Sequence, residues 1–398
     1  MADAERMRNV ARRVAETYRK GNQVVAVLSA QGHTTDELIQ KAKELNPNPS
    51  KRELDMLLAT GEQQSVALLA MALHKLGLSA ISLTGQQIGV ISTSAHGSAR
   101  IRRIDTERIY TELDRNNIVI AAGFQGINRS GDITTLGRGG SDTTAVALAA
   151  VLKADYCEIY TDVDGVYTAD PRIVKNAMKM EEIRYDEMLE LAALGAKVLC
   201  TRSVELAKKY QVPLVVRSSM SSAPGTVVKE EAKVENTYIS GLAVDKDVAS
   251  VSVIGIKNKP GMAYKIFSLL AKENIVVDII LQSIGRDATK DIAFTVTRND
   301  VPQVMEILSK NEALLGFEGL AYDDKVIKLS VVGAGMASHP GVASMLFEAL
   351  YSGGINIVMI STSEIKISVL IDERDADAAA NVVHDRFFTG SAAIAANF

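Results

Sequence analysis

Apolar runs alternate with amphipathic segments along the first 218 residues. Continuous apolar runs such as QVVAVLSA at 23–30 and NIVIAAGF at 117–124 are typical of strands buried on both faces of a parallel sheet. The pattern predicts strands over 23–30, 81–84, 117–124 and 212–218, and at the start of 156–172. It predicts helices over 6–20, 61–77 and 106–115, and helices that begin near residues 34 and 51. Thr34 or Thr35 is the expected cap of the helix that begins near residue 34. This alternation indicates an α/β fold with helices on both faces of a mostly parallel sheet.

The stretch TTLGRGGSDTTAVALAAVLKA, residues 134–154, joins a glycine-rich polar loop to an apolar helix. Its glycines allow the backbone to approach a ligand closely, and Ser141 or Asp142 is suited to cap the helix. The N–H groups of a first helical turn attract anions, and Arg138 offers a planar fork for a carboxylate or phosphate. We interpret the stretch as an anion site; a helix start without a ligand is the simpler alternative.

Three further polar loops, at 29–36, 123–126 and 161–172, each follow a predicted strand. The carboxyl ends of parallel strands meet at one edge of a sheet, where such folds bind their ligands. We therefore expect these loops to converge with residues 137–142 on one cleft.

A boundary rich in Ser, Pro, Gly and charge at 219–237 precedes an internal repeat. Residues 251–283 resemble residues 329–363, and from each Pro-Gly onward the two copies keep a constant offset, which pairs Gly261 with Gly341. Each copy has a βαββα pattern with a last strand expected, which is typical of a small ferredoxin-like unit. The helix N-termini after Pro-Gly are suited to a small zwitterion, and the sheet edges to pairing across a dimer.

Composition removes several classes of function. The 44 Lys and Arg against 48 Asp and Glu give a net charge of −4 without a long basic run, which argues against a nucleic-acid footprint. Without an N-terminal apolar region or an apolar run of about 18 residues, we expect a cytosolic protein that does not bind membranes. Cys157 and Cys200 have no metal or disulfide spacing and are expected to be reduced core residues. The five histidines show no ligand pattern, although His33 lies in the 29–36 loop.

GFQG (123–126), TTLGRGGSD (134–142) and TDVDGVYTADPR (161–172), with the SAQGHTTDEL turn and the GEQQS helix start, resemble the motifs of the aspartate kinases in order and spacing. The tandem repeat is similar to the ACT-domain pair of that family's regulatory region, and the similarity covers almost the whole chain. The resemblance implies a three-layer amino-acid-kinase sheet domain over 1–225, a linker over 226–244, and two ferredoxin-like (βαββαβ) ACT domains over 245–323 and 324–398.

The resemblance also implies ATP-dependent phosphorylation of the β-carboxylate of L-aspartate to 4-phospho-L-aspartate, the first step of lysine, threonine and methionine synthesis. A carboxylate with a pKa of about 4 is already ionised, so no general base is required. By resemblance, the aspartate-site residues are Ser29, Thr35, Glu62, Arg138 and Ser141. We hypothesise that Arg138 holds a substrate carboxylate, Glu62 the ammonium group, and that Asp142 orients substrate or metal. For Glu62 the alternative is a favourable charge in a first helical turn, worth about 0.3–1 kcal/mol.

ATP-site positions follow from the same resemblance and comprise Thr161, Asp162, Tyr167, Asp170, Arg172 and Lys197. Arg172 and Lys197 are expected to neutralise phosphates, and Tyr167 to line the nucleoside pocket. Mg²⁺ is expected to arrive mainly with the ATP phosphates, without a dedicated protein metal site.

Effector positions implied by the ACT resemblance are Asn258, Gly261, Ala263, Asp278 and Gln282 in the first copy, and Asn356, Thr362, Ser363 and Glu364 in the second. They correspond to places where such pairs bind lysine or threonine. Inhibition requires the amino acid to bind an inactive arrangement better than the active one. We also expect a homodimer or larger oligomer formed through the ACT domains.

One departure from the family pattern is at the start of the chain. Aspartate kinases begin with a strand ending in Lys-(Phe/Tyr)-Gly-Gly-(Ser/Thr), whereas MADAERMRNVARR matches the helix that follows it. The first strand is therefore expected to be missing, which leaves two unpaired neighbours in the sheet and weaker transition-state stabilisation. A misassigned or truncated start and a poor catalyst are the two explanations.

Two functional alternatives stay open. One is a kinase for another acidic amino acid, such as glutamate or acetylglutamate, and the other is a regulatory subunit or amino-acid sensor without catalysis. GINRSGD (126–132) and VVGAGMAS (331–338) lack defining residues of the P-loop and dinucleotide motifs, and both are expected to be turns.

Overall fold

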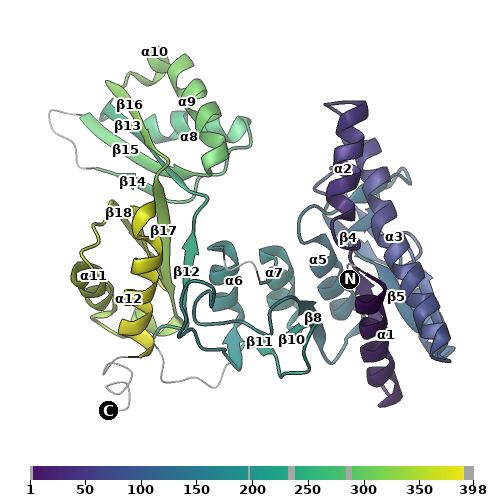
Figure 1. The fold of residues 1–398 in the computed structure, drawn as a ribbon. Helices are drawn as coiled ribbons and strands as arrows, with labels where there is room; N and C mark the ends of the chain where they lie inside the picture. The colour runs from purple at the N-terminus through teal and green to yellow at the C-terminus, as the bar shows by residue number, and fades with distance from the viewer. Residues whose placement is uncertain (1–2, 196–197, 232–237, 284–288, 390–398) are drawn as a thin grey trace. The chain divides into compact units, whose positions relative to one another are not determined.

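The structure is a computed structural model that describes residues 3–195, 198–231, 238–283 and 289–389. The chain forms two compact units, whose elements are labelled in Figure 1. The first unit comprises Met1–Val166, Met180–Ala192 and Lys197–Lys233, and the second comprises Tyr167–Lys179, Ala193–Ala196 and Val234–Phe398. The second unit therefore contains the internal repeat together with a short segment, Tyr167–Lys179, that precedes the last strands of the first.

The first unit contains a parallel sheet with helices on both faces. β1 (Val25–Leu28), β5 (Ile118–Ala122) and β2 (Ala80–Leu83) pair in the order β1-β5-β2. Alternate side chains of β5 point to opposite faces, as the twofold period of a strand requires. Ile118 and Ile120 pack with α1 (Ala4–Arg19) and α3 (Lys51–Lys75). Val119 and Ala121 pack with residues of α4 (Glu107–Asp114) and α5 (Gly140–Leu152). The predicted three-layer α/β arrangement is confirmed.

Helix α3 is continuous, whereas we expected one helix from 51 and a second over 61–77. Gly61 does not start a helix. It allows close packing, because a Cβ placed at Gly61 would lie 2.8 Å from the Cβ of Ala30. Glu62 therefore lies in the middle of α3, and the interpretation of Glu62 as a favourable first-turn charge is wrong.

The expected helix caps are also corrected. Helix α2 (Thr34–Leu45) begins after His33, and no side chain caps it, so neither Thr34 nor Thr35 has that role. Helix α5 begins at Gly140, and Gly139 takes the cap position with a φ of 68°, which favours glycine. Ser141 and Asp142 consequently lie in the first turn, where their side chains are available for other contacts.

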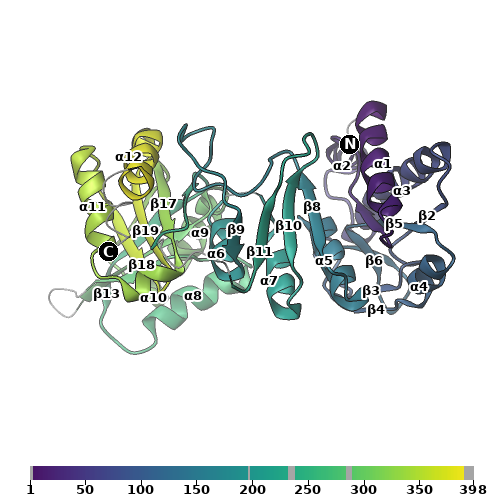
Figure 2. The ribbon, with the colours of Figure 1, turned by 90° about the horizontal axis from the view of Figure 1, so that it is seen from below.

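Two further sheets complete the first unit. β8 (Cys157–Thr161), β10 (Leu214–Ser218), β11 (Thr226–Lys229) and β9 (Glu182–Arg184) lie side by side in that order (Figure 2). The helices α6 (Tyr185–Ala193) and α7 (Thr201–Tyr210) belong to the same part of the chain. Within the described residues, β1 pairs only with β5 and β8 only with β10, so each strand has one edge without a partner. β11 lies at the start of the stretch 226–244, which we expected to be a linker.

The third sheet consists of short strands that the apolar pattern does not predict. β4 (Ile101–Ile104), β3 (Val90–Ser92), β6 (Gln125–Ile127) and β7 (Ile133–Thr135) pair in the order β4-β3-β6-β7. Strands of three or four residues are too short to show a period. The GINRSGD segment makes the turn between β6 and β7, where Asn128 Oδ1 accepts hydrogen bonds from the backbone of Ser130 and Asp132. It is a turn, as expected.

The second unit contains two ferredoxin-like domains, as the repeat predicts. In the first domain, β13 (Ala249–Lys257), α8 (Met262–Lys272), β14 (Ile280–Gln282), β15 (Thr289–Val296), α9 (Val301–Lys310), α10 (Glu312–Leu315) and β16 (Gly319–Asp323) follow one another. In the second, β17 (Val326–Val332), α11 (Val342–Ser352), β18 (Met359–Thr362), β19 (Lys366–Asp372) and α12 (Ala376–Phe388) repeat the pattern. VVGAGMAS runs from β17 into a 3₁₀ turn.

The second domain takes its fourth strand from an unexpected place. β12 (Gly241–Asp245) precedes the first domain in sequence and pairs antiparallel with β17, which gives the order β12-β17-β19-β18. The first domain has the equivalent order β16-β13-β15-β14. β12 therefore holds the position that β16 holds in the first copy, and the first domain is inserted into the second. Residues after 389, where a strand following α12 would lie, are outside the described residues.

Among the described residues, α3 is the one helix long and apolar enough to cross a membrane by length and composition. Half of its apolar window is buried inside the protein, and the charged residues Asp55 and Glu62 are among its buried positions. These features are those of a core helix.

Candidate active site

The carboxyl ends of β1 and β5 lie side by side in the first unit. Leu28 and Ala122 are paired in register, and the backbone N–H of Gly123 donates to the carbonyl of Leu28 over 3.0 Å. Ser29 follows β1 directly and is exposed. The loops at 29–36 and 123–126 therefore begin at the same sheet edge, as the sequence predicts.

Glu62 approaches this edge from α3. Its Oε1 accepts a hydrogen bond from the backbone N–H of Ala30 over 3.1 Å, while its buried Oε2 has no partner among the described residues. Only 3% of the residue is exposed. Burial raises the pKa of Glu62 to about 7, because the charged carboxylate loses its water, and backbone hydrogen bonds from Glu62 and Ala30 offset this loss only in part. A buried carboxyl oxygen without a partner is uncommon, and a bound cation is one explanation for it.

The glycine-rich loop closes the same edge from the other side. Ser141 lies against Gly123, since a Cβ placed on that glycine would be 2.7 Å from the Ser141 Oγ. The backbone N–H groups in the first turn of α5 face an open helix end, because Gly139 offers no side-chain cap. Arg138 is exposed and, within the described part of the chain, its guanidinium has no hydrogen bond or ion pair. Burial raises the pKa of Asp142 in the first turn, partly offset by a hydrogen bond from the backbone of Cys200.

Thr35 lies in the first turn of α2 and is half-buried. The preceding residue, Thr34, is close to Gly61, whose Cβ would lie 3.5 Å from the Thr34 Cγ2. The structure thus places Ser29, Glu62 and Ser141 at one sheet edge, with Arg138 on the adjoining loop and Thr35 beside the turn that Glu62 binds.

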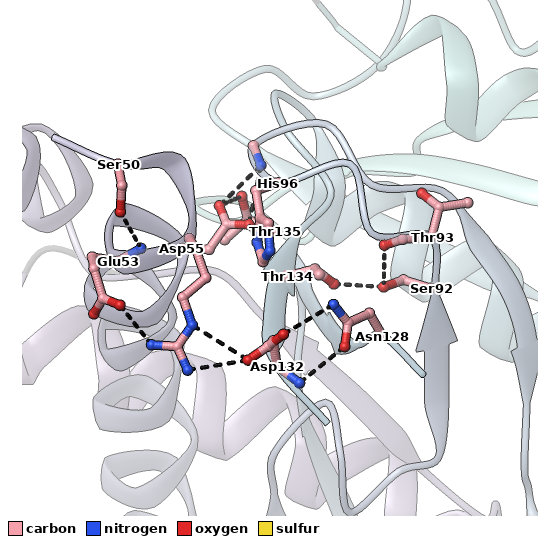
Figure 3. A network of polar contacts seen from close by, with 12 residues as sticks. Ser50, Glu53, Asp55, Ser92, Thr93, His96, Asn128, Asp132, Thr134 and Thr135 are labelled. Atoms are coloured by element: carbon pink, nitrogen blue, oxygen red, sulfur yellow. Dashed lines mark hydrogen bonds and ion pairs between the residues drawn. The ribbon is translucent and has the colours of Figure 1, made fainter. Parts of the chain in front are cut away.

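The buried carboxyl group of Asp55 connects the elements that lead into the glycine-rich loop (Figure 3). Asp55 accepts hydrogen bonds from Thr135 Oγ1 over 2.6 Å, from His96 Nδ1 over 2.9 Å and from the backbone N–H of Gly97 over 3.0 Å. One carboxyl group thereby ties α3, the loop at 96–97 and β7 together. Because β7 leads directly into the glycine-rich loop, the position of that loop depends on Asp55.

Arg202 on α7 also holds the glycine-rich loop, through backbone carbonyls. Its guanidinium donates to the carbonyls of Leu136 and Ala99, each over 3.0 Å. Burial lowers the pKa of Arg202, since the charged form has lost part of its water. Cys200 also contacts the loop: a Cβ on Gly139 would lie 2.4 Å from the Cys200 Sγ, so only glycine fits there. Cys157 is a buried core thiol, and burial raises its pKa to about 12.

The expected ATP-site residues fall into both units. Thr161 ends β8 and donates from Oγ1 to Asp162 over 3.0 Å, within the first unit. Tyr167, Asp170 and Arg172 belong to the second unit, where Arg172 donates to Asp170 through Nε and Nη2, the latter over 2.7 Å. This ion pair lowers the pKa of Asp170. Lys197 lies outside the described residues.

Four of the expected effector residues line a single cavity of about 340 Å³ in the first ACT domain. Asn258, Gly261, Ala263 and Gln282 surround it together with Lys257, Lys259 and Lys290. Gly261 precedes α8 with a φ of 89°, which leaves the N-terminus of that helix open to the cavity. Asp278 is not part of this lining, and instead its carboxylate pairs with the buried Lys328 over 2.5 Å.

The second-copy residues lie on exposed loops of the second ACT domain. Asn356 precedes β18, and Thr362 ends it. Ser363 and Glu364 form the turn to β19, where the backbone N–H of Ser363 donates to the carbonyl of Lys366 over 2.8 Å. Asn356 therefore lies before the start of β18, whereas the other three residues lie at its end.

Comparison with known proteins decides the family. Residues 1–218 match the amino acid kinase family, and residues 251–311 and 329–387 match the ACT domain. An aspartokinase of Corynebacterium glutamicum is 54% identical over 396 residues, which cover 98% of this chain and 94% of that protein. The chain belongs to the aspartokinase family.

Solved structures agree with this assignment. An aspartate kinase from Synechocystis is 44% identical with a TM-score of 0.54, and the match covers 98% of this chain and 68% of that chain. E. coli aspartokinase III, solved with aspartate and ADP, has a TM-score of 0.80 at 24% identity and 97% coverage of both chains, which shows the shared fold.

Within this aspartokinase fold, the motif reasoning missed three residues beside the site. Phe124 adopts a φ of 67°, an uncommon conformation for a non-glycine residue, and its ring lies against Gly140. Asp55 and Arg202 were also missed. For Asp55 a signal existed, since it precedes Glu62 by seven residues and so lies on the same face of one helix. Arg202 had none, because its partners are backbone carbonyls distant in sequence.

Replacing Asp55 should damage both stability and the site. In Asp55→Asn the amide nitrogen cannot accept the bonds now made to the carboxyl group, so we expect a loss of about 1–3 kcal/mol in free energy of unfolding and at least a tenfold lower kcat/KM. Denaturant unfolding and steady-state kinetics measure the two effects. Asp132→Asn is the matched control, because Asp132 pairs with the half-exposed Arg52 and the loss of an exposed ion pair should change the free energy of unfolding little. Equal behaviour of the two variants would contradict the role given to Asp55.

The raised pKa of Glu62 predicts a pH-dependent stability. A carboxyl group ordinarily near 4.5 that titrates at about 7 when folded binds more protons folded than unfolded. Its contribution is thus fully present below pH 4.5 and lost as the pH rises through 7. Without ligand, the wild type should lose about 3 kcal/mol relative to Glu62→Gln between pH 5 and pH 8. Denaturant unfolding at both pH values measures this. Glu53→Gln, at an exposed position of the same helix, should show the same pH dependence of the free energy of unfolding as the wild type. If Glu62→Gln also showed the wild-type pH dependence, the pKa of Glu62 would not be raised.

Proposed function

We propose that this chain transfers the γ-phosphoryl group of ATP to the β-carboxylate of L-aspartate, producing 4-phospho-L-aspartate for lysine, threonine and methionine synthesis in the cytoplasm. The observation that carries the proposal is the buried Oε2 of Glu62, which lacks a partner among the described residues at a sheet edge shared with Ser29 and Ser141. The ammonium group of an amino acid supplies the donor and the positive charge that this oxygen lacks.

The remaining side chains of the candidate site are proposed to bind the two carboxylates of aspartate. Arg138 is exposed on a glycine-rich loop and offers a planar fork to a substrate carboxylate. Ser29, Thr35 and Ser141 supply hydroxyl groups, and the open N-terminus of α5 supplies backbone N–H groups that favour an anion. The reacting carboxylate is already ionised, so the site needs alignment and charge neutralisation and no general base. Asp142 in the first turn orients substrate or metal.

ATP is proposed to contact Thr161, Asp162, Tyr167, Asp170, Arg172 and Lys197. Arg172 has an exposed guanidinium that already binds an anion, the carboxylate of Asp170, and phosphate oxygens suit the same donors. No group of three or more His, Cys, Asp or Glu side chains suited to a metal ion occurs among the described residues. Mg²⁺ is proposed to be held mainly by the nucleotide's phosphates.

The direct test measures acyl phosphate formation from L-aspartate with ATP and Mg²⁺, trapped as the hydroxamate. We expect the wild type to form product and Arg138→Ala to have at least tenfold lower kcat/KM for aspartate, because the substrate carboxylate loses a charge-assisted pair. Arg129→Ala, which removes an exposed arginine from the turn between β6 and β7, should match the wild type.

Three outcomes would contradict this proposal in different ways. An unchanged kcat/KM in Arg138→Ala would remove that residue from substrate binding. Product from glutamate or acetylglutamate in place of aspartate would indicate another acidic amino acid as acceptor. Binding of lysine or threonine without ATP turnover would favour a sensor or regulatory subunit.

Feedback control is proposed to act through the cavity beside α8. Its three lysines and the open helix N-terminus suit the carboxylate of an amino acid, and Asn258 and Gln282 suit its polar groups. Lysine or threonine is the proposed effector, with the second-copy residues Asn356, Thr362, Ser363 and Glu364 as a related site. The ACT domains are also the proposed contact of a homodimer or larger oligomer.

Gln282→Ala should raise the lysine or threonine concentration for half-inhibition at least fivefold and leave kcat unchanged, because Gln282 lines the cavity in the second unit. Kinase assays across a series of each amino acid measure the shift. Gln303→Ala, on the exposed face of α9, is the control. Unaltered inhibition by both amino acids would exclude Gln282 from effector binding.

A further inference from the structure

The segment Tyr167–Lys179 is a hairpin that starts and ends in the first unit but is built into the second. At its base, Met180 donates to the carbonyl of Val166 over 2.9 Å, and Thr226 Oγ1 accepts from the backbone N–H of Val166 over 2.8 Å. Both of these bonds lie within the first unit. From Tyr167 onward, which is bridged to Lys179, the hairpin belongs to the second unit.

Inside the second unit, the hairpin is part of the core of the second ACT domain. Ala169 and Val174 are buried in one apolar cluster with residues of β17, α11 and α12. The backbone N–H of Leu242 on β12 donates to the carbonyl of Thr168 over 2.7 Å, and Asn381 Nδ2 on α12 donates to the carbonyl of Ile173 over 3.2 Å. These contacts fix the first arm of the hairpin and its turn.

One side chain of α12 makes a buried polar contact with the hairpin. His384 is fully buried, and its Nε2 lies 2.9 Å from Thr168 Oγ1. Thr168 Oγ1 also accepts from the backbone N–H of Met178 over 2.9 Å, so the same hydroxyl joins both arms of the hairpin to α12. The ring stacks on Phe388 with centroids 4.6 Å apart, and its Nδ1 has no partner among the described residues.

Burying His384 in this position costs free energy, so we ask what the geometry of its hydrogen bond to Thr168 provides in return. An apolar residue would fill the position without burying an imidazole nitrogen that lacks a partner. Burial lowers the pKa of His384, so the ring is neutral near pH 7 and can make a directional hydrogen bond without a buried charge. Two residues beyond Thr168, Asp170 begins a turn in which its carbonyl accepts from Ile173 and Val174 and its carboxylate binds Arg172. The direction of Thr168 therefore sets the start of this turn.

We propose that His384 is a positioning residue for nucleotide binding: through Thr168 it holds the turn that carries Asp170 and Arg172. The inference rests on the proposed function, in which that turn contacts ATP. It assigns the regulatory unit's last helix a part in substrate binding, although His384 itself touches no substrate. A change in the packing of α12 reaches the start of the turn through the bond between His384 and Thr168.

The test compares variants that remove the contact with variants that keep it. His384→Phe retains an aromatic ring to stack on Phe388 but removes the nitrogen, and Thr168→Val removes the hydroxyl at similar volume. Both should raise the KM for ATP at least fivefold and keep the KM for aspartate within twofold. Thr168→Ser keeps the hydroxyl and should stay close to the wild type. The double variant should resemble the single ones, since both act on the same bond.

The matched control lies in the same domain. Ser330 and Ser368 form a buried hydroxyl pair 2.8 Å apart between β17 and β19, on the face of the sheet opposite Leu329 and Val331, which pack in the same cluster as the hairpin. Ser330→Ala should lower thermal stability, as the other variants do, and leave the KM for ATP unchanged. This control separates a positioning role from a general loss of packing. If His384→Phe does not fold, His384→Gln and Thr168→Val carry the comparison.

The outcomes separate this inference from the proposed function. Calorimetric titration of the wild type with Mg·ATP comes first, and no binding together with no turnover would overturn both. Binding and turnover in the wild type with an unchanged KM for ATP in folded His384→Phe and Thr168→Val would overturn only the role of His384. Equal rises in both KM values, or a rise in Ser330→Ala, would show that the variants act through stability and would also overturn it.

Discussion

The fold of the first unit depends on burying two carboxyl groups on one helix. Asp55 and Glu62 lie on the same face of α3, inside a domain where an uncompensated carboxylate costs several kcal/mol. Three donors satisfy Asp55, which thereby holds β7 and the loop at 96–97 in place. Glu62 receives one donor and keeps one oxygen without a partner among the described residues. The Asp55 carboxyl group thus stabilises the fold, whereas the second oxygen of Glu62 is available to accept a hydrogen bond from a ligand.

This arrangement requires α3 to pack closely against Ala30, which follows β1. Gly61 makes the approach possible, since any side chain there would collide with Ala30. The same approach brings the backbone N–H of Ala30 to Glu62. Gly139 in the glycine-rich loop has an equivalent role, because a Cβ at this position would collide with the side chain of Cys200. Both glycines allow close packing of elements that carry the candidate site, so its geometry depends on these two contacts.

The sequence predicts the long periodic elements and the repeat, because buried strands and amphipathic helices carry their period locally, and it also predicts that the loops after β1 and β5 begin at one sheet edge. It failed where the deciding partner is distant in sequence. Gly61 looked like a helix start, because its packing partner Ala30 is 31 residues away. The strands β3, β4, β6 and β7 are too short for a period, and β12 gives no local sign that it pairs with β17. Arg202 binds carbonyls, which no motif records.

The second unit is not a module joined to the first by a single linker. Its second ACT domain is completed by β12, which comes directly after the kinase sheet in sequence, and its core includes the hairpin Tyr167–Lys179 from the middle of the kinase sequence. The chain therefore enters this domain three separate times. A packed core has discrete arrangements and deforms little between them, so a ligand that changes this domain's packing also biases the backbone of two segments continuous with the kinase domain. The topology of the chain thus joins the two units through the backbone of several segments.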